Sequence, residues 1–494
     1  MLNAEGTRTA RVLRRFEDLP GPRALPLVGN SLQLKGARLH LQMEKWCREF
    51  GPYYRLKLGN RPTLVIGEHE TVAGVLRDRP DGFRRTSRLE EIWTEMGLQP
   101  GVFGANGESW RRQRRMVMAG FDPAHIKSYY PALCTVAQRL TRRWQAAARD
   151  GRAIDLQADL MRYTVDTIAG LAFGTEVNTL ESDEDVIQKH LDKIFPALWR
   201  RITAAIPTWR LLRSRADREL EQGIAAVNAA VDRFIAQARE RLRLDPARAQ
   251  QPPNLLEAMI VAADAPDSGI DDRQVAGNVL TMLLAGEDTT ANTIAWMIYL
   301  LWRHPQALAR ANDEVHRVIA DPMQPTREEL ARLEYVEACA HETMRLKPVA
   351  PLIGLQTLHE TTIGDVQVPP GVMVFSLMRR DSVSDEFIPQ AAAFEPQRWL
   401  VEGGPRQAAS AAKRISMPFG AGPRICPGRY LALLEMKMAM AMLLNHFEIE
   451  GVDTPDGGEA EERLSFTMAP LDLRLRLRSR GNESAHGRER SHHP

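Results

Sequence analysis

The chain has 494 residues, 44% of them hydrophobic, and its 65 basic and 63 acidic side chains leave a net charge of +2. A chain of this length can bury an interior large enough for a cofactor, and its balanced charge gives no sign of a nucleic-acid-binding surface. Its four scattered cysteines lack disulfide or CxxC spacing, which is typical of a reducing compartment, so we expect a cytoplasmic protein.

No Gly/Ser-rich linker or charge block divides the chain, so we expect one large, mostly helical domain over residues 19–479. Residues 1–18 are polar and carry several arginines, and we expect a flexible N-terminal segment there. Residues 480–494 are polar and charged, which predicts a disordered tail.

The first part of the domain predicts a small sheet flanked by helices. After a proline-stiffened stretch, apolar periodicity indicates a helix at 39–50. Strands at 53–58 and 63–67 then form a hairpin around a Gly59-Asn60 turn, and a short helix follows at 70–77. Residues 81–107 have mixed polarity and weak periodicity.

Long helices dominate the middle of the chain. A basic helix begins at Glu108, and apolar residues at helical spacing predict further helices at 123–149 and 156–173. The segment 194–212 mixes apolar and basic residues. This mixture is compatible with a mobile lid, with contact to a membrane surface, or with ordinary helix ends and a loop.

The longest helical pattern, residues 270–302, contains Ala285-Gly-Glu-Asp-Thr-Thr290 at its centre. A glycine inside a helix costs about 1 kcal/mol relative to alanine, and a hydroxyl one turn later can bond back to a carbonyl. This feature, beside the carboxylates of Glu287 and Asp288, indicates a helix passing over a reactive centre; a structural kink is the alternative. The two carboxylates also interrupt the apolar run, so no transmembrane anchor is predicted.

Cys426 lies in the stretch Met417-Pro-Phe-Gly-Ala-Gly-Pro-Arg-Ile-Cys-Pro-Gly-Arg-Tyr430. Its glycines and prolines force a rigid loop, and apolar periodicity predicts a helix from Arg429 to Phe447 directly after it. At a helix N-terminus, backbone N–H groups and the helix dipole are expected to lower the pKa of the thiol.

Several roles for this cysteine are compared. A buried core cysteine does not need a loop built from glycines. A nucleophile needs a histidine base, and none lies near in sequence, although a distant one stays open. A zinc site needs further ligands at metal spacing, which are absent. A single thiolate with its other ligands supplied elsewhere points to haem iron.

At this point several motifs resemble a known family. Phe419-Gly-x-Gly-x-Arg-x-Cys-x-Gly is similar at every position to the haem-binding signature of the cytochrome P450 family. The sextet at 285–290 resembles the family's oxygen-activation motif. Trp110-x-x-x-Arg114, Glu342-x-x-Arg345 and a later arginine, Arg398, follow in the family's order, and the resemblance covers residues 19–479.

The resemblance implies a cytochrome P450 fold: mostly α with small β-sheets (α+β), with haem b between the long central helix and the helix after the cysteine loop. It makes Cys426 the iron ligand, Asp288 the acid and Thr289 the hydroxyl that relays protons, while Glu287 occupies a variable position of open role. The other implied cofactor-binding residues are Arg424, Trp110 and Arg114, toward the haem propionates, and Phe419, Gly420, Gly422, Gly428 and Ala285. Glu342, Arg345 and Arg398 are implied to be structural.

Two positions depart from the family pattern. Many relatives carry a propionate-binding arginine where this chain has Leu355, so that contact is missing or made by another residue. The usual Arg-Asp-Pro appears here as Arg380-Asp-Ser382. We interpret both as subfamily variation.

The implied function is a monooxygenase that inserts one atom of O2 into a hydrophobic small molecule, such as a fatty acid, terpenoid or steroid-like compound. No flavin or iron–sulfur segment is recognised, so electrons are expected from a separate donor, either ferredoxin with its reductase or a flavodoxin-type protein. Apolar segments at 349–353 and 466–468 are expected to line the pocket. The candidates within 81–107 are Phe83, Leu89, Ile92, Trp93, Met96, Val102 and Phe103.

Two alternatives are a haem-thiolate enzyme that uses or rearranges peroxides and a non-catalytic haem-thiolate sensor. The intact pair of Asp288 and Thr289 argues against both.

Overall fold

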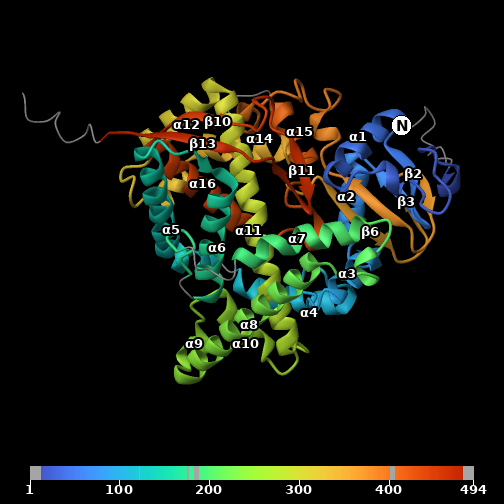
Figure 1. Cartoon of the computed structure of the whole chain (residues 1–494), viewed down its shortest axis with the longest axis horizontal. Coiled ribbons are helices and arrows are strands. Elements are labelled where there is room, and N and C mark those ends of the chain that lie inside the picture. The colour runs from blue at the N-terminus through green and yellow to red at the C-terminus, as the bar shows by residue number, and fades with distance from the viewer. Residues whose placement is uncertain (1–12, 122, 175–176, 183–187, 401–405, 482–494) are drawn as a thin grey trace, which may run out of the picture.

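The computed structural model describes residues 13–121, 123–174, 177–182, 188–400 and 406–481. Figure 1 shows a sheet-rich side around β2, β3 and β6 and a helical side around α5, α6 and α16, with α11 running through the middle. The expected mostly helical α+β architecture is confirmed.

The α-helices are α1 (Leu39–Phe50), α2 (His69–Arg77), α3 (Ser87–Glu95), α4 (Gly107–Gly120), α5 (Pro123–Arg149), α6 (Leu156–Phe173), α7 (Gln188–Thr203), α8 (Arg215–Leu244), α9 (Ala247–Gln250), α10 (Leu255–Ala263), α11 (Asp272–Arg303), α12 (Pro305–Val318), α13 (Arg327–Ala331), α14 (Glu334–Leu346), α15 (Arg406–Ile415) and α16 (Arg429–His446). The strands are β1 (Arg14–Arg15), β2 (Tyr53–Leu58), β3 (Arg61–Ile66), β4 (Phe83–Arg85), β5 (Ile154–Asp155), β6 (Leu352–Thr357), β7 (Thr361–Ile363), β8 (Val366–Val368), β9 (Met373–Leu377), β10 (Phe447–Asp453), β11 (Glu462–Ser465), β12 (Thr467–Pro470) and β13 (Arg474–Ser479).

The largest sheet among these strands has the order β2-β3-β9-β6-β4. β3 pairs in parallel with β9, and the other neighbours are antiparallel. In the β4–β6 pair, Arg85 lies directly opposite Leu355. One face of the sheet packs on a separate apolar core that includes Leu64, Leu355 and Val374. The edge strand β4 therefore carries Arg85 at the border of the sheet.

The main core surrounds α11, which packs along α6 and also contacts α14 and α16. Gly286 lies in the α6 contact, where a Cβ atom would come within 3.0 Å of Ile168 Cγ1. Helix α11 is continuous through this residue. The glycine therefore permits close packing of α6, and it does not break the helix.

The predicted helices largely coincide with the observed ones. The bounds expected for α1, α5 and α6 are those of the structure, and α11 and α16 differ by one or two residues at their ends. These segments have long, regular apolar periodicity, which packing against the core then reinforces.

Part of the segment expected to be flexible, residues 14–18, forms secondary structure. β1 pairs with β8, the guanidinium of Arg14 binds Asp365 at 2.7 Å, and Phe16 is buried against the smaller core. Residues 1–12 lie outside the described residues, as does most of the expected tail, residues 482–494.

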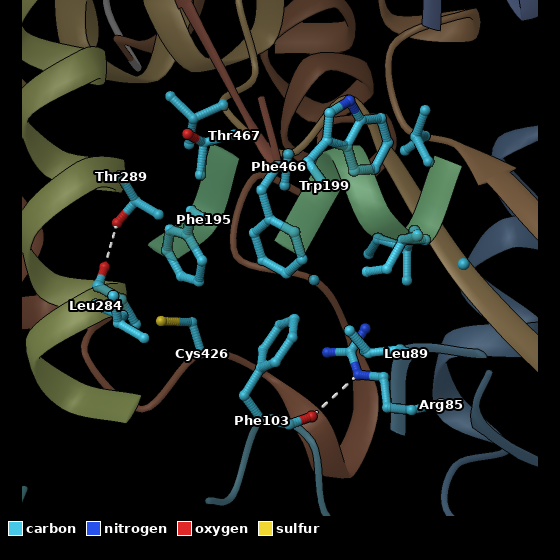
Figure 2. Close-up of a pocket in the computed structure, with 18 of the residues that line it drawn as sticks. Arg85, Leu89, Phe103, Phe195, Trp199, Leu284, Thr289, Cys426, Phe466 and Thr467 are labelled. Carbon is cyan, nitrogen blue, oxygen red and sulfur yellow. Dashed lines mark hydrogen bonds between the residues drawn. The ribbon is translucent and has the colours of Figure 1, made fainter. Parts of the chain in front are cut away.

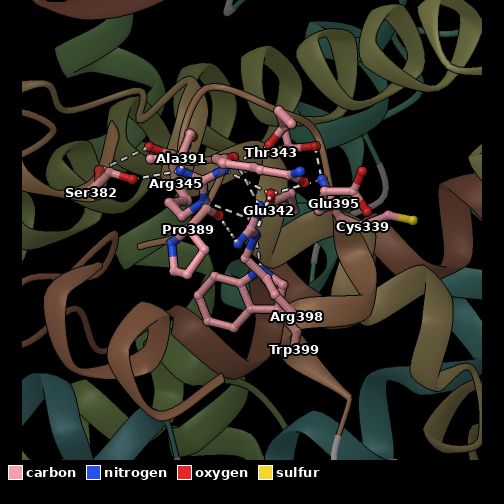
Figure 3. Close-up of polar contacts among 12 residues, drawn as sticks. Cys339, Glu342, Thr343, Arg345, Ser382, Pro389, Ala391, Glu395, Arg398 and Trp399 are labelled. Carbon is pink, nitrogen blue, oxygen red and sulfur yellow. Dashed lines mark hydrogen bonds and ion pairs between the residues drawn. The ribbon is translucent and has the colours of Figure 1, made fainter. Parts of the chain in front are cut away.

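A buried ion-pair network connects α14 to the segment before the cysteine loop (Figure 3). Glu342 accepts from Arg345 at 2.7 and 2.8 Å, from Arg398 Nε at 2.9 Å and from Trp399 Nε1 at 2.8 Å. Arg345 also donates to the carbonyls of Ser382, Ala391 and Ala393. Burial raises the pKa of Glu342, but the arginines outweigh it and hold the pKa below its usual range.

Candidate functional site

A cavity of about 670 Å³ lies where α11, the cysteine loop and the edge of the large sheet meet. Figure 2 shows Cys426 and Thr289 on one side of it and Arg85 with Phe103 on the other. Most of the predicted site residues line it: Thr289, Ala285, Cys426, Arg424, Trp110, Arg114, Phe419, Gly420 and Gly428. Gly422, Glu287 and Asp288 do not.

The cysteine loop has the rigid geometry expected from its glycines. The amide of Cys426 donates to Phe419 O at 2.9 Å, and Arg114 donates to Ile425 O at 2.8 Å. Gly422 has a φ of +71°, and a Cβ atom there would lie 2.6 Å from Arg77 Cα. Gly422 therefore shapes the loop against α2, although it does not reach the cavity.

The expected lowering of the Cys426 pKa is wrong for the protein chain by itself. Burial raises the pKa of the thiol, and the Gly428 amide, Arg114 and Arg429 only partly offset it. The helix N-terminus is present as expected. However, removing the sulfur from water destabilises the thiolate by more free energy than these groups contribute to stabilising it. Binding of a cation at the sulfur would reverse this balance, because a coordinating thiol is deprotonated outright.

Four arginines meet at one edge of the cavity: Arg79, Arg85, Arg114 and Arg424. Each donates to a backbone carbonyl, of Leu76, Phe103, Ile425 and Ala105 respectively. Within the described part of the chain, none of the four forms an ion pair with a carboxylate. Arg424 also stacks on Trp110, with its guanidinium carbon 4.8 Å from the ring centroid.

The electrostatics of this arginine cluster are unfavourable without an anion. Burial lowers the pKa of Arg79 to about 10. It lowers the pKa of Arg85 well below its usual value, and the positive charges of Arg79 and Arg424 lower it further. The Nε atom of Arg424 is buried with no hydrogen-bond partner. Buried cations need a partner, so the cluster fits a ligand with carboxylate groups, such as the propionates of haem.

The structure also resolves the departure at Leu355. Its side chain is fully buried in the smaller core and does not line the cavity. Arg85, on the neighbouring strand and in register with Leu355, faces the cavity instead. Sequence reasoning missed Arg79 and Arg85; the missing arginine at 355 was the signal that another cation should replace it.

On α11, the hydroxyl of Thr289 faces the cavity and donates to Ala285 O at 2.7 Å, which is the expected back-bond to a carbonyl (Figure 2). Asp288 lies outside the cavity lining. Its Oδ1 accepts from Asn292 at 2.8 Å, and its Oδ2 accepts from the hydroxyl of Thr467. Glu287 is buried, and its backbone carbonyl accepts from the hydroxyl of Thr164 on α6 at 2.9 Å. The structure therefore brings Thr289, but neither carboxylate, to the cavity surface.

A second polar pair next to Thr289 was not predicted. Thr290 and, on α16, Glu435 both line the cavity, and the Thr290 hydroxyl partly offsets the effect of burial on the pKa of the Glu435 carboxyl. Burial raises the pKa of Glu435 to about 8. Nothing in the apolar periodicity of α16 distinguishes this glutamate from a solvated one.

The cavity walls are largely apolar and come from the expected segments. Those from the N-terminal half are Leu89, Trp93, Val102, Phe103, Phe195, Trp199 and Ile202, and those from the C-terminal half are Val349, Leu352, Ile353 and Phe466. Phe83, Ile92 and Met96, which were also candidates, are buried in the cores and do not line the cavity. Trp209 and Arg210 of the segment at 194–212 bind Glu95 of α3, while Ile206, Leu211 and Leu212 are exposed.

Comparisons with known proteins identify the class. The cytochrome P450 family model matches residues 19–476, so the chain belongs to the cytochrome P450 family. The family implies a haem cofactor and monooxygenase activity. A crystal structure of the cytochrome P450DA haem domain superposes with a TM-score of 0.80 at 25% identity, covering 95% of this chain and 99% of that one.

Relatives with curated descriptions differ in what they contain. The chain is 28% identical to the chloroplastic carotene epsilon-monooxygenase of Arabidopsis thaliana, over 84% of this chain and 78% of the relative. It is 26% identical to a bifunctional cytochrome P450/NADPH–P450 reductase of Bacillus cereus, over 96% of this chain but only 43% of the relative. Among the described residues, no helix is long and apolar enough to cross a membrane.

Proposed function

We propose that this protein is a haem-thiolate monooxygenase that inserts one oxygen atom of O2 into a hydrophobic small molecule, with Cys426 as the iron ligand and electrons from a separate redox partner. The observation that carries this proposal is the placement of the Cys426 sulfur in an apolar cavity. Four arginines at one edge of this cavity bind backbone carbonyls but, among the described residues, no carboxylate. The sulfur suits the haem iron, the cations suit the propionates, and the apolar walls suit the porphyrin ring.

Bound haem would supply an iron centre that activates O2, so that with two electrons and two protons one oxygen atom enters a C–H bond and the other leaves as water. Arg79, Arg85, Arg114 and Arg424 bind the propionates through charge-assisted hydrogen bonds, and Trp110 supports Arg424. Phe419, Gly420 and Gly428 shape the loop beside the sulfur, and Ala285 leaves room on α11. Thr289 holds a proton at its hydroxyl inside the cavity. Asp288, the preceding residue, is the acid that resupplies this proton. Glu287 is buried outside the cavity lining and has no assigned step.

The substrate is proposed to be an apolar molecule of the fatty acid, terpenoid or steroid type. Phe103, Phe195 and Phe466 form an aromatic wall of the cavity and would hold such a molecule and exclude water. The relative described as a carotene epsilon-monooxygenase is consistent with a terpenoid.

A ferredoxin or flavodoxin-type protein is proposed as the electron donor. Arg429 begins the helix after the cysteine loop, and Arg115 follows the residue that bonds to the loop carbonyl of Ile425. Positive charge there suits an acidic donor surface. The four free cysteines suit a reducing compartment such as the cytoplasm.

The test is the absorption spectrum of the reduced, carbon-monoxide-bound protein and of its Cys426→Ser variant. We expect a Soret band strongly red-shifted from that of a histidine-ligated haem, and its loss in the variant. Cys134→Ser is the matched control, because Cys134 lies outside the cavity beside Pro325, and it should keep the band. A band typical of histidine ligation in the wild-type protein would contradict the proposal. Fatty acids, terpenoids and steroids can then be screened by the shift they cause in the ferric spectrum.

A further inference from the structure

The turn between β11 and β12 brings one strained residue into the cavity. Phe466 has a φ of +88°, a backbone conformation that is costly for a residue with a bulky side chain. Its ring stacks on Phe195 with centroids 4.5 Å apart and meets Phe103 edge-on at 5.7 Å (Figure 2). The aromatic contacts inside the cavity therefore help to hold the strained backbone in place.

The next residue, Thr467, connects this turn to α11. Its side chain lines the cavity, and its hydroxyl donates to Asp288 Oδ2. The other carboxylate oxygen of Asp288 accepts from Asn292 at 2.8 Å, and the amide of Met468 is fixed to Val349 O at 2.8 Å. The carboxylate is therefore directed at Thr467 and Asn292, while the hydroxyl of Thr289 bonds to Ala285 O.

We propose that Thr467 is a positioning residue that holds the Asp288 carboxylate away from the cavity until a substrate displaces the ring of Phe466. Phe466 contacts the substrate, and the adjacent Thr467 holds the Asp288 carboxylate. A backbone rotation that relaxes the φ of Phe466 therefore also moves the hydroxyl of Thr467. Loss of that hydrogen bond lets the carboxylate turn toward Thr289. The inference rests on the proposed function and adds to it a link between substrate occupancy and the proton relay.

This arrangement has a direct consequence for electron use. Without substrate, Thr467 holds the Asp288 carboxylate away from the cavity, so protons are delivered slowly and little NAD(P)H is consumed. With substrate, the ring moves and the acid becomes available. The same hydrophobic contact that binds the substrate therefore permits the reaction.

The first test removes the hydroxyl while keeping the shape of the side chain. In Thr467→Val, we expect NAD(P)H consumption in the absence of substrate to rise about tenfold, because a hydrogen bond to a charged group is lost. Thr467→Ser should restore slow consumption. Thr141→Val is the control for placing valine at a buried threonine, since Thr141 lies on α5 and bonds only to the Ala137 carbonyl; it should behave as wild type. Equal consumption by Thr467→Val and wild type would overturn the proposal.

A second variant imitates the substrate. Phe466→Ala removes the ring but keeps Thr467, and we expect substrate-free consumption to rise as it does in Thr467→Val. Consumption as slow as in wild type would show that the ring does not control the acid.

A crystal structure of Thr467→Val without substrate gives a readout that does not depend on activity. We expect the carboxylate of Asp288 to turn from its present position toward Thr289, and an unchanged position would overturn the proposal. This measurement also separates two kinds of failure. If the carbon-monoxide spectrum shows no thiolate ligation, the proposed function fails, whereas the position of Asp288 still decides whether Thr467 holds it.

Discussion

Two groups of arginines that are buried or half-buried in this protein differ in their partners. Arg345 and Arg398 both bind the carboxylate of Glu342, and Arg345 also fills its remaining donors with three carbonyls. The four arginines at the cavity edge bond to carbonyls and, within the described residues, to no carboxylate. The first group is complete within the chain, whereas the second is complete only with an anionic ligand.

This difference separates structural from ligand-binding charge. Removing one member of a complete buried pair leaves an uncompensated charge and destabilises the fold. Removing a cation that has no counter-charge relieves a desolvation cost in the empty protein and weakens only the bound form. The two groups should therefore respond in opposite ways to the loss of one residue.

The largest effect is expected for Glu342→Ala. It leaves Arg345 and Arg398 buried without a carboxylate, so the free energy of unfolding should fall by about 3–5 kcal/mol. The measurement is urea denaturation followed by circular dichroism. A loss below about 1 kcal/mol is the size expected for a solvent-screened surface pair, and it would mean that the buried network does not hold the fold together.

Leu355→Ala should come next and should affect only the fold. The side chain is fully buried in the smaller core, and truncating such a leucine costs about 2–5 kcal/mol. Because Leu355 does not line the cavity, the rate of haem loss from the folded protein should stay that of wild type. Haem transfer to an excess of apomyoglobin measures this rate, and faster loss would contradict the separation of sheet core from cavity.

Arg85→Leu should show the reverse behaviour. It removes a charge-assisted contact worth about 1.5–3 kcal/mol, so haem affinity should fall by about 10- to 100-fold. The unfolding free energy of the haem-free protein should be unchanged or higher, because an unpaired guanidinium is no longer buried.

The matched control for Arg85→Leu is Arg84→Leu on the same strand. Arg84 binds Glu90 and does not line the cavity, so its loss should leave haem affinity unchanged. Equal haem affinity in the two variants would show that Arg85 does not bind a propionate.

The sequence predicts the whole first group but only half of the second. Glu342, Arg345 and Arg398 belong to motifs with fixed spacing, and so do Arg114, Arg424 and the cysteine loop. Arg79 and Arg85 belong to no motif. Arg85 reaches the cavity because β4 pairs with β6 at the edge of a sheet, and such long-range pairing is not visible in local periodicity.

The same limit explains two other differences. The position of Asp288 depends on a hydroxyl from Thr467, 179 residues away in the chain. The raised pKa of Cys426 depends on burial by several elements, whereas the expected lowering considered only the local helix end. Local geometry and the contacts of motif residues were therefore predictable from the sequence, whereas contacts between distant segments outside any motif were not.

The smallest effect is expected for a third kind of arginine, one that is paired but exposed. Arg478 on β13 binds Glu448 and Glu450 on β10, and 66% of its side chain is accessible to water. Water screens this pair, so Arg478→Ala should change the unfolding free energy by no more than about 1 kcal/mol and leave haem affinity as in wild type. Urea denaturation at low and high salt measures both the size and the screening of the effect. A loss as large as that of Glu342→Ala would show that pairing alone, without burial, determines the stability contributed by an arginine, and the contrast between the two buried groups would then need another cause.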